Sequence, residues 1–83
     1  MKAVYFAWVR ERIGKSEEML SPPPNVATVG DLIGWLKEQG DGYEAAFADA
    51  GAIRAAIDQT HARREAPIAG AREIAFFPPM TGG

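Results

Sequence analysis

The sequence predicts an α+β domain in which a mixed sheet of four to five strands packs on one main helix. Three observations support this fold class. Residues 3–8 form an aromatic and β-branched run, residues 53–59 alternate between the two faces of a strand, and residues 29–36 carry apolar side chains at helical spacing. With 83 residues, the chain has room for a single core.

The first strand is expected at Ala3–Trp8. Successive side chains of a strand point to opposite faces of the sheet, so Lys2, Phe6 and Trp8 share one face. Because a lysine is in phase with these aromatic residues, we expect that face to be the open one. The other face is then expected to contact the core.

The segment after this strand turns polar. Residues 9–13 predict a short turn of helix that ends at Gly14. A short second strand is expected at Glu17–Leu20, and the three prolines within residues 21–25 predict a stiff, exposed turn after it.

The main helix begins after Thr28, a natural N-cap, with Asp31 placed to complete a capping box. Its apolar stripe consists of Val29, Leu32, Ile33 and Leu36. Gly40 is expected to end the helix. Gly34 inside the helix is unfavourable, and we expect it to mark a close approach to the sheet.

The second half of the chain predicts one more helix and two more strands. Asp41–Ala50 is expected to be a short helix closed at Gly51, and Ile53–Gln59 a third strand. Residues 61–66 are predicted to be a polar connection. The last strand is expected at Arg72–Phe77.

Composition excludes several classes of function. The formal net charge is −2 and the basic residues are scattered, which argues against a nucleic-acid partner. The absence of cysteine excludes disulfides, cysteine-ligated zinc and thiol catalysis. No acidic cluster has metal-site spacing. His61 is the only histidine, and we interpret it as a surface residue or an interface contact rather than a catalytic base.

The N-terminal apolar run is too short to span a membrane and lacks a signal-peptide cleavage site. We therefore expect a cytoplasmic protein with no membrane partner.

The C-terminal residues have a different character from the rest of the chain. Strand pairing should stop at Pro78, because proline cannot donate to a ladder. We therefore expect a folded domain at residues 1–77 and an extended, flexible tail at residues 78–83. Gly82 and Gly83 have no Cβ, so the terminal carboxylate is unhindered and is the candidate reactive group. A frayed, functionless end is the alternative.

An apolar patch is expected at the base of this tail. Phe77 is in phase with Glu73, which predicts an exposed aromatic side chain. If the first and last strands are neighbours, Phe6, Trp8 and Phe77 cluster there. Such patches on small proteins mark binding surfaces.

The order of elements is that of the ubiquitin-like β-grasp fold. At Glu73–Gly83, which contains Phe-Phe-Pro-Pro-Met-Thr-Gly-Gly, the chain resembles the small subunit of molybdopterin synthase. Residues 9–11 after the first strand and the helix start at residues 28–32 also match that family. The resemblance covers nearly the whole chain.

This resemblance implies a sulfur carrier in molybdenum cofactor synthesis. An ATP-dependent adenylating enzyme would activate the Gly83 carboxylate, and a sulfur donor system would convert it to a thiocarboxylate. The tail residues Pro78, Pro79, Met80, Thr81 and Gly82 would then enter the large synthase subunit, in an expected heterotetramer. Because the catalytic side chains are expected in the large subunit, the carrier would be a non-catalytic subunit. We expect it to bind no cofactor and no metal.

The resemblance also suggests partner contacts. Phe6 and Phe77 match family positions on the surface that meets the large subunit, whereas His61 stands where the family usually has an apolar residue. Two further departures are Ala71-Arg72, in place of Gly-Asp, and Asp58, in place of a frequent Asn. These two lie in a predicted turn and rim.

Three alternatives remain open from the sequence. The chain could carry sulfur for thiamine synthesis or tRNA thiolation, although those tails generally lack Phe-Phe-Pro-Pro. It could be a ubiquitin-like modifier conjugated to lysines through Gly83. It could also be an interaction module with an inert tail.

Overall fold

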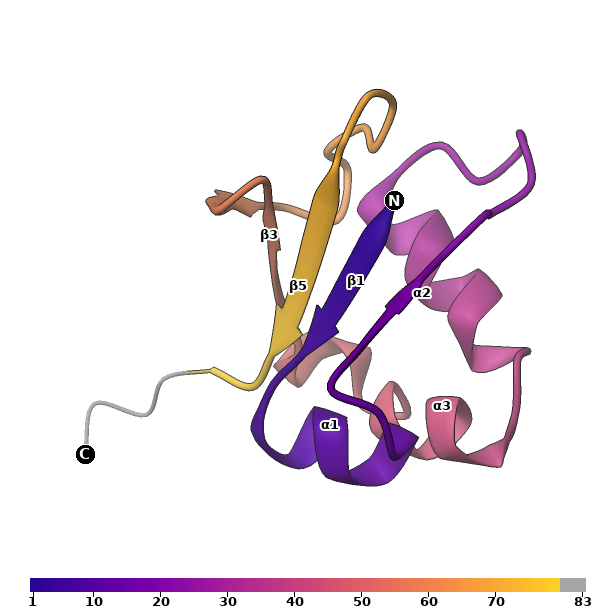
Figure 1. The fold of residues 1–83 in the computed structure, drawn as a ribbon, viewed down its shortest axis with the longest axis vertical. Helices are drawn as coiled ribbons and strands as arrows, with labels where there is room; N and C mark the ends of the chain where they lie inside the picture. Colours follow the sequence, from indigo (N-terminus) through magenta and orange to yellow (C-terminus); the bar gives the residue numbers. More distant parts are fainter. Residues whose placement is uncertain (80–83) are drawn as a thin grey trace.

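The computed structural model describes residues 1–79 and shows one five-stranded sheet with its helices gathered on one side (Figure 1). The elements in chain order are β1 (Lys2–Tyr5), α1 (Ala7–Ile13), β2 (Glu17–Met19), α2 (Val29–Lys37), α3 (Asp41–Ala46), a 3₁₀ turn (Ala50–Ala52), β3 (Arg54–Ile57), β4 (Thr60–Ala62) and β5 (Glu73–Phe77).

The strand order across the sheet is β2-β1-β5-β3-β4. The two strands β1 and β5 run parallel, and every other neighbouring pair is antiparallel. The predicted mixed sheet and its single main helix are therefore confirmed.

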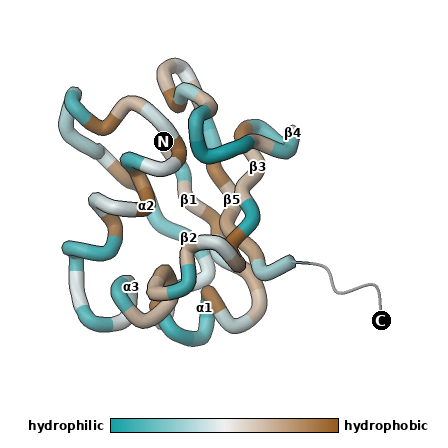
Figure 2. Tube along the Cα trace, turned by 180° about the vertical axis from the view of Figure 1, so that it is seen from behind, coloured by the Kyte–Doolittle hydropathy of each residue, from teal (hydrophilic) through white to brown (hydrophobic). Residues whose placement is uncertain are grey.

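The core lies between α2 and the inner face of the sheet. The whole predicted stripe of α2 is buried, and it meets fully buried side chains from β1 and β5, namely Ala3, Tyr5, Ile74 and Phe76. The ring of Phe47 closes this core edge-to-face on Phe76, at a centroid distance of 5.1 Å. Figure 2 shows the hydrophobic segments of α2, β1 and β5 gathered centrally, with hydrophilic segments around them.

The start of α2 has the predicted capping box. The Asp31 amide donates to Thr28 Oγ1 at 3.1 Å, and the Thr28 amide donates to Asp31 Oδ2 at 3.3 Å. Such a cap contributes about 1 kcal/mol to the stability of the folded protein. It fixes the end of the helix against which the loop of residues 63–66 lies.

The first strand is shorter than predicted. It ends at Tyr5, and α1 begins at Ala7, whose φ of 53° breaks the extended backbone. The Phe6 carbonyl accepts from the Val9 and Arg10 amides, and Val9 becomes fully buried. Trp8 therefore lies on a helix and not in phase with Phe6 on a strand. The predicted helix end at Gly14 is confirmed by its φ of 87°.

The predicted third strand, Ile53–Gln59, is in fact the first arm of a hairpin. Asp58 and Gln59 have φ values of 48° and 71°, which turn the chain back into β4. A two-residue turn with two positive φ angles usually contains glycine, so the sequence contains little sign of it. As a result, His61 lies on a strand and not in the polar connection that we predicted.

Two further predictions about the helices are wrong. The second helix ends at Ala46 rather than Ala50, because Phe47 turns into the core. Gly34 is exposed, and a Cβ added there would have no atom within 4 Å, so this glycine marks no close approach. The close approach is at Gly42 on α3, where a Cβ would lie 2.6 Å from the carbonyl oxygen of Arg12.

A polar cluster ties β1, β2 and α3 together. Oε2 of Glu18 accepts from the hydroxyls of Tyr5, at 2.8 Å, and Tyr43, at 2.7 Å. Lys15 Nζ donates to Glu18 Oε1 at 3.1 Å. Desolvation raises the pKa of Glu18, but the hydrogen bonds from Tyr43, Tyr5 and Lys15 outweigh it, so the pKa lies below its usual value. Burial and the Glu18 carboxylate raise the pKa of Tyr5.

The two glycines provide a matched test of helix packing. Gly42→Ala should lower the free energy of unfolding by about 1 to 3 kcal/mol, because the new methyl group collides with backbone. Gly34→Ala should raise it by up to about 1 kcal/mol, because alanine is the better helix former and the space is open. Urea denaturation measures both values. Equal stabilisation by the two changes would show that α1 and α3 can separate at no cost.

The adjacent glutamates of β2 provide a second matched pair. Glu18→Gln should lower the free energy of unfolding by about 1 to 2 kcal/mol at pH 7, because three hydrogen bonds lose their charged acceptor. Glu17→Gln, which loses only the exposed pair with Lys2, should cost less than about 0.5 kcal/mol.

The pH dependence of this difference is fixed by the direction of the pKa shift. The pKa of Glu18 is lower in the folded state than its unfolded value of 4.5. The ionised carboxylate therefore contributes fully to the free energy of unfolding above pH 4.5, and this contribution is lost as the pH falls through the lower, folded-state pKa. The gap between the parent protein and Glu18→Gln, measured by urea denaturation, should therefore shrink below pH 4.5. A gap that stays constant into acid would contradict the role of the charge.

Candidate functional site

The parallel pairing of β1 with β5 places the carboxyl ends of both strands at the same edge of the sheet. Tyr5 is in register with Phe76, and the Phe6 amide donates to the Phe76 carbonyl at 3.1 Å. Phe6 therefore lies beside Phe77, at the point where the chain leaves the sheet. The predicted proximity of these two aromatic residues to the base of the tail is confirmed.

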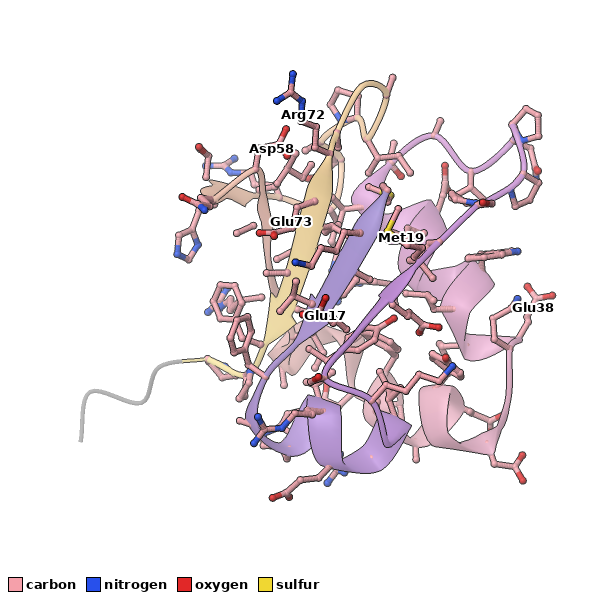
Figure 3. The ribbon with its side chains drawn as sticks, in the orientation of Figure 1. Glu17, Met19, Glu38, Asp58, Arg72 and Glu73 are labelled. Carbon is pink, nitrogen blue, oxygen red and sulfur yellow. The ribbon has the colours of Figure 1, made fainter. Side chains whose placement is uncertain are left out.

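The side chains on the side of the sheet away from α2 form what we call the outer face. We assign side chains to this face from their alternation along each strand and from the register between neighbouring strands. They are Glu17 and Met19 of β2; Lys2 and Val4 of β1, with Phe6 just beyond its end; Glu73, Ala75 and Phe77 of β5; Arg54 and Ala56 of β3; and His61 of β4. Figure 3 views the sheet from this side and labels Glu17, Met19 and Glu73.

The outer face is charged at one end and apolar at the other. At the charged end, Lys2 pairs with Glu17 at 3.5 Å and is in register with Glu73. At the apolar end, Phe6 is 47% exposed and Phe77 is half-buried. The chain leaves the sheet at the apolar end, where residue 78 follows the last residue of β5.

His61 joins this apolar end. It is in register with Ala56, and its ring meets the ring of Phe77 edge-to-face at a centroid distance of 5.6 Å. The sequence indicated an interface role for His61, but only the unpredicted β4 brings it to Phe77.

Two residues of this face were not predicted to be site residues. Met19 is 74% exposed on β2 and is in register with Lys2, so it adds an apolar side chain at the charged end of the outer face. Arg54 is in register with Phe77 and adds a positive charge beside the apolar end. The large methionine side chain in a short strand was a usable signal, whereas the place of Arg54 requires the register of β3 with β5.

Trp8, predicted to share the patch, lies on α1 instead. It is half-buried against the core, and the guanidinium of Arg12 stacks over its ring at 4.4 Å. The indole is thus occupied by core packing and a cation–π contact. It is not part of the outer face.

Asp58, one of the departures from the family pattern, has a structural role. Its Oδ1 accepts from the amides of Arg72, at 3.0 Å, and Glu73, at 2.9 Å, while its own amide donates to the Glu73 carbonyl. The turn between β3 and β4 thereby fixes the start of β5. The departures at Asp58 and Arg72 thus lie together before the first residue of β5 (Figure 3), whereas Phe77 is the last residue of that strand.

The tail is described only at its base. β5 ends at Phe77, as the prolines predicted, and Pro78 and Pro79 follow outside the ladder, both half-buried. The tail residues predicted to reach the partner and carry the reactive group, Met80, Thr81, Gly82 and Gly83, lie outside the described residues.

Residues 1–79 contain no group of three or more side chains placed to hold a metal ion. In the same part of the chain, no helix has both the length and the apolar character needed to cross a membrane.

Comparison with known proteins assigns the chain to a family. A family model described as the ThiS family matches residues 3–83. The chain belongs to the ThiS family. Two relatives, from Escherichia coli (strain K12) and Haemophilus influenzae, are each named molybdopterin synthase sulfur carrier subunit. Each is 35% identical over 83 residues, which cover 100% of this chain and 99% of the relative.

Solved structures confirm the fold of this ThiS-family chain. SAMP1 from Haloferax volcanii superposes with a TM-score of 0.72 at 25% identity, covering 100% of this chain and 98% of the other. A structure from Pyrococcus furiosus superposes with a TM-score of 0.75 at 24% identity, covering 95% of each chain, and supports the fold alone. The chain therefore has the ubiquitin-like β-grasp fold that the resemblance implied.

Proposed function

We propose that the chain is the sulfur carrier subunit of a molybdopterin synthase and carries sulfur as a thiocarboxylate on Gly83. The observation that carries this proposal is the apolar end of the outer face, where Phe6, Phe77 and His61 gather at the base of the tail. A carrier of this kind needs a docking surface and a reactive group in one place. Support also comes from the two full-length relatives that bear this name.

The proposed chemistry takes place on the terminal carboxylate. A partner enzyme transfers AMP from ATP to this carboxylate and releases pyrophosphate. Sulfur at the oxidation level of sulfide, supplied by a donor system, then displaces AMP and leaves a C-terminal thiocarboxylate. Neither step needs a side chain of this chain as acid or base. The carrier itself binds no cofactor, and the ATP is consumed by the activating enzyme.

Sulfur delivery then takes place in the large subunit. The thiocarboxylate sulfur attacks the pyranopterin precursor, and water restores the carboxylate, so that two charged carriers are used for each dithiolene. Holding the sulfur on a slim arm restricts its attack to the partner's pocket, where it is positioned and shielded from water. We place this exchange in the cytoplasm.

The outer face is the proposed contact with the large subunit. Phe6 and Met19 are the large exposed apolar side chains of the described residues, and both lie on this face. Covering them with a partner removes apolar area from water, which stabilises the complex by about 25 cal/mol per Å². The assembly expected is a heterotetramer with the carriers docked on the large subunits.

A second candidate function is protein modification through Gly83. The solved structures of similar fold include one named H. volcanii small archaeal modifier protein 1, which is the ground for considering it. An isopeptide-linked adduct on lysines that survives thiol treatment would support this role. Sulfur transport for thiamine synthesis or tRNA thiolation would instead give a thiocarboxylate that the molybdopterin synthase large subunit does not discharge.

Intact-mass spectrometry tests the carrier chemistry. Protein co-expressed with its activating enzyme and sulfur donor should gain about 16 Da, because one oxygen is replaced by sulfur, and fragmentation should map the gain to Gly83. A variant that lacks Gly83 is the control and should show no gain. An unchanged mass in the parent protein under active sulfur supply would contradict the proposal.

Phe77→Ala tests the docking surface. It should weaken binding to the large subunit by at least about 1 kcal/mol, roughly fivefold in Kd, because an aromatic anchor at the centre of an interface is lost. Isothermal titration calorimetry measures the affinity, and circular dichroism checks the fold. Glu38→Gln, at the end of α2 away from the outer face, is the control and should bind as the parent does (Figure 3). Unaltered affinity of Phe77→Ala would exclude the apolar end from the interface.

A further inference from the structure

A concave surface lies under the β3–β4 hairpin, on the side of α2, and reaches the outer-face residues Arg54 and His61 at its edge. It is a groove of about 510 Å³ between this hairpin, the first turns of α2 and residues 63–65. Its volume falls within the range of about 300 to 1,000 Å³ that is typical of ligand sites. The carrier chemistry proposed above makes no use of it.

The groove exists because small side chains stand at paired positions. Ala55 of β3 is in register with Ala62 of β4, and both belong to the inner face. The corresponding inner positions of β1 and β5 hold Tyr5 and Phe76, which fill the space under α2. Under the hairpin the alanines leave that space open, over the apolar side chains of Val29, Ile33 and Ile53.

The rim of the groove is basic. Arg54, Arg63 and Arg64 line it, together with a single carboxylate, that of Glu65. Three of the nine basic residues of a chain with a net charge of −2 are thus gathered around one groove. The ion pairs found within residues 1–79 are Lys2–Glu17 and Lys15–Glu18, so in this part of the chain the three guanidinium groups have no carboxylate partner.

The segment that carries two of these arginines is held in place by the backbone. The Gly30 amide of α2 donates to the Arg64 carbonyl at 2.9 Å, and the Val29 amide donates to the Ala66 carbonyl at 3.0 Å. The Ala66 amide also donates to the Arg63 carbonyl, which closes a tight turn. The arginines therefore project from a fixed base, which lowers the entropy cost of binding.

The nature of the ligand follows from what the groove offers. A free phosphate needs several donors, but the first amides of α2 already donate to Arg64, Ala66 and Thr28, and the Asp31 carboxylate lies at the same helix end. An apolar floor with a charged rim instead suits a peptide that places an aliphatic side chain inward and carboxylates outward. We propose that this groove binds an acidic peptide segment of a partner protein, with an aliphatic residue on the floor and its acidic residues at the arginines of the rim, chiefly Arg63 and Arg64.

Peptide binding in the groove needs no sulfur chemistry. The groove does share Arg54 and His61 with the outer face, whereas its floor and the arginines Arg63 and Arg64 lie apart from the apolar end. The full chain can be tested without any sulfur-transfer enzyme.

The test uses a fluorescein-labelled peptide, Asp-Asp-Leu-Ile-Asp-Asp, titrated with the full chain and followed by fluorescence anisotropy. Binding should be saturable and should weaken with added salt. The double variant Arg63→Glu/Arg64→Glu should raise Kd at least about tenfold, because attraction becomes repulsion. Replacing the aspartates of the peptide by asparagines should have a similar effect. Arg10→Glu on α1, an exposed arginine away from the groove, is the charge control and should leave Kd unchanged.

Two further measurements locate the bound peptide on the protein. Ala62→Phe should fill the groove and abolish binding, and Met19→Ala, on the outer face at the opposite edge of the sheet, should leave binding intact. Amide shifts in NMR spectra should fall on the groove residues, which keeps the test valid if Ala62→Phe fails to fold. Absence of saturable binding, shifts confined to the outer face, or displacement of the peptide by inorganic phosphate at equal concentration would each overturn the proposal.

Discussion

The fold depends on the parallel pairing of β1 with β5. These strands come from opposite ends of the sequence, and they lie within the sheet rather than at its edges, so the core under α2 exists only when they are side by side. Bringing residues 2–5 to residues 73–76 carries a large loop-closure cost. Tyr5, Ile74 and Phe76, all fully buried, provide the burial that offsets it. The same pairing brings Phe6 beside Phe77, so the contacts that form the core also assemble the apolar end of the outer face.

The sheet separates two kinds of chemistry onto its two faces. Inward positions of β1 and β5 are fully apolar except for the hydroxyl of Tyr5, which donates its hydrogen bond to Glu18 of the edge strand. The outward-facing side chains change from charged, at the Lys2–Glu17 pair, to apolar, at the end formed by Phe6 and Phe77. This gradient gives the outer face a direction, because only one of its ends lies at the base of the tail. Residues 78 and 79 continue the chain from that apolar end.

Much of this arrangement could be predicted from the sequence. The capping box of Thr28 and Asp31, the stripe of α2 and the partial exposure of Phe77 follow from local spacing, and the structure confirms each. The strand end after Tyr5 could not be predicted, because the aromatic side chains of Phe6 and Trp8 favour a strand, whereas the helix that begins at Ala7 buries Val9 in the core. The Asp58-Gln59 turn was missed because it lacks glycine. Without β4, the contact of His61 with Phe77 and the basic groove could not be foreseen.

The short edge strands have a consequence for solubility. β2 and β4 are each three residues long, and the prolines of residues 22–24 stop β2 from extending. Long flat edges act as templates for sheet-to-sheet polymerisation, and short ones do not. The exposed side chains of Phe6 and Met19 already present apolar area through which copies of the chain can associate. The short edges of β2 and β4 limit a second route, the pairing of strands between copies.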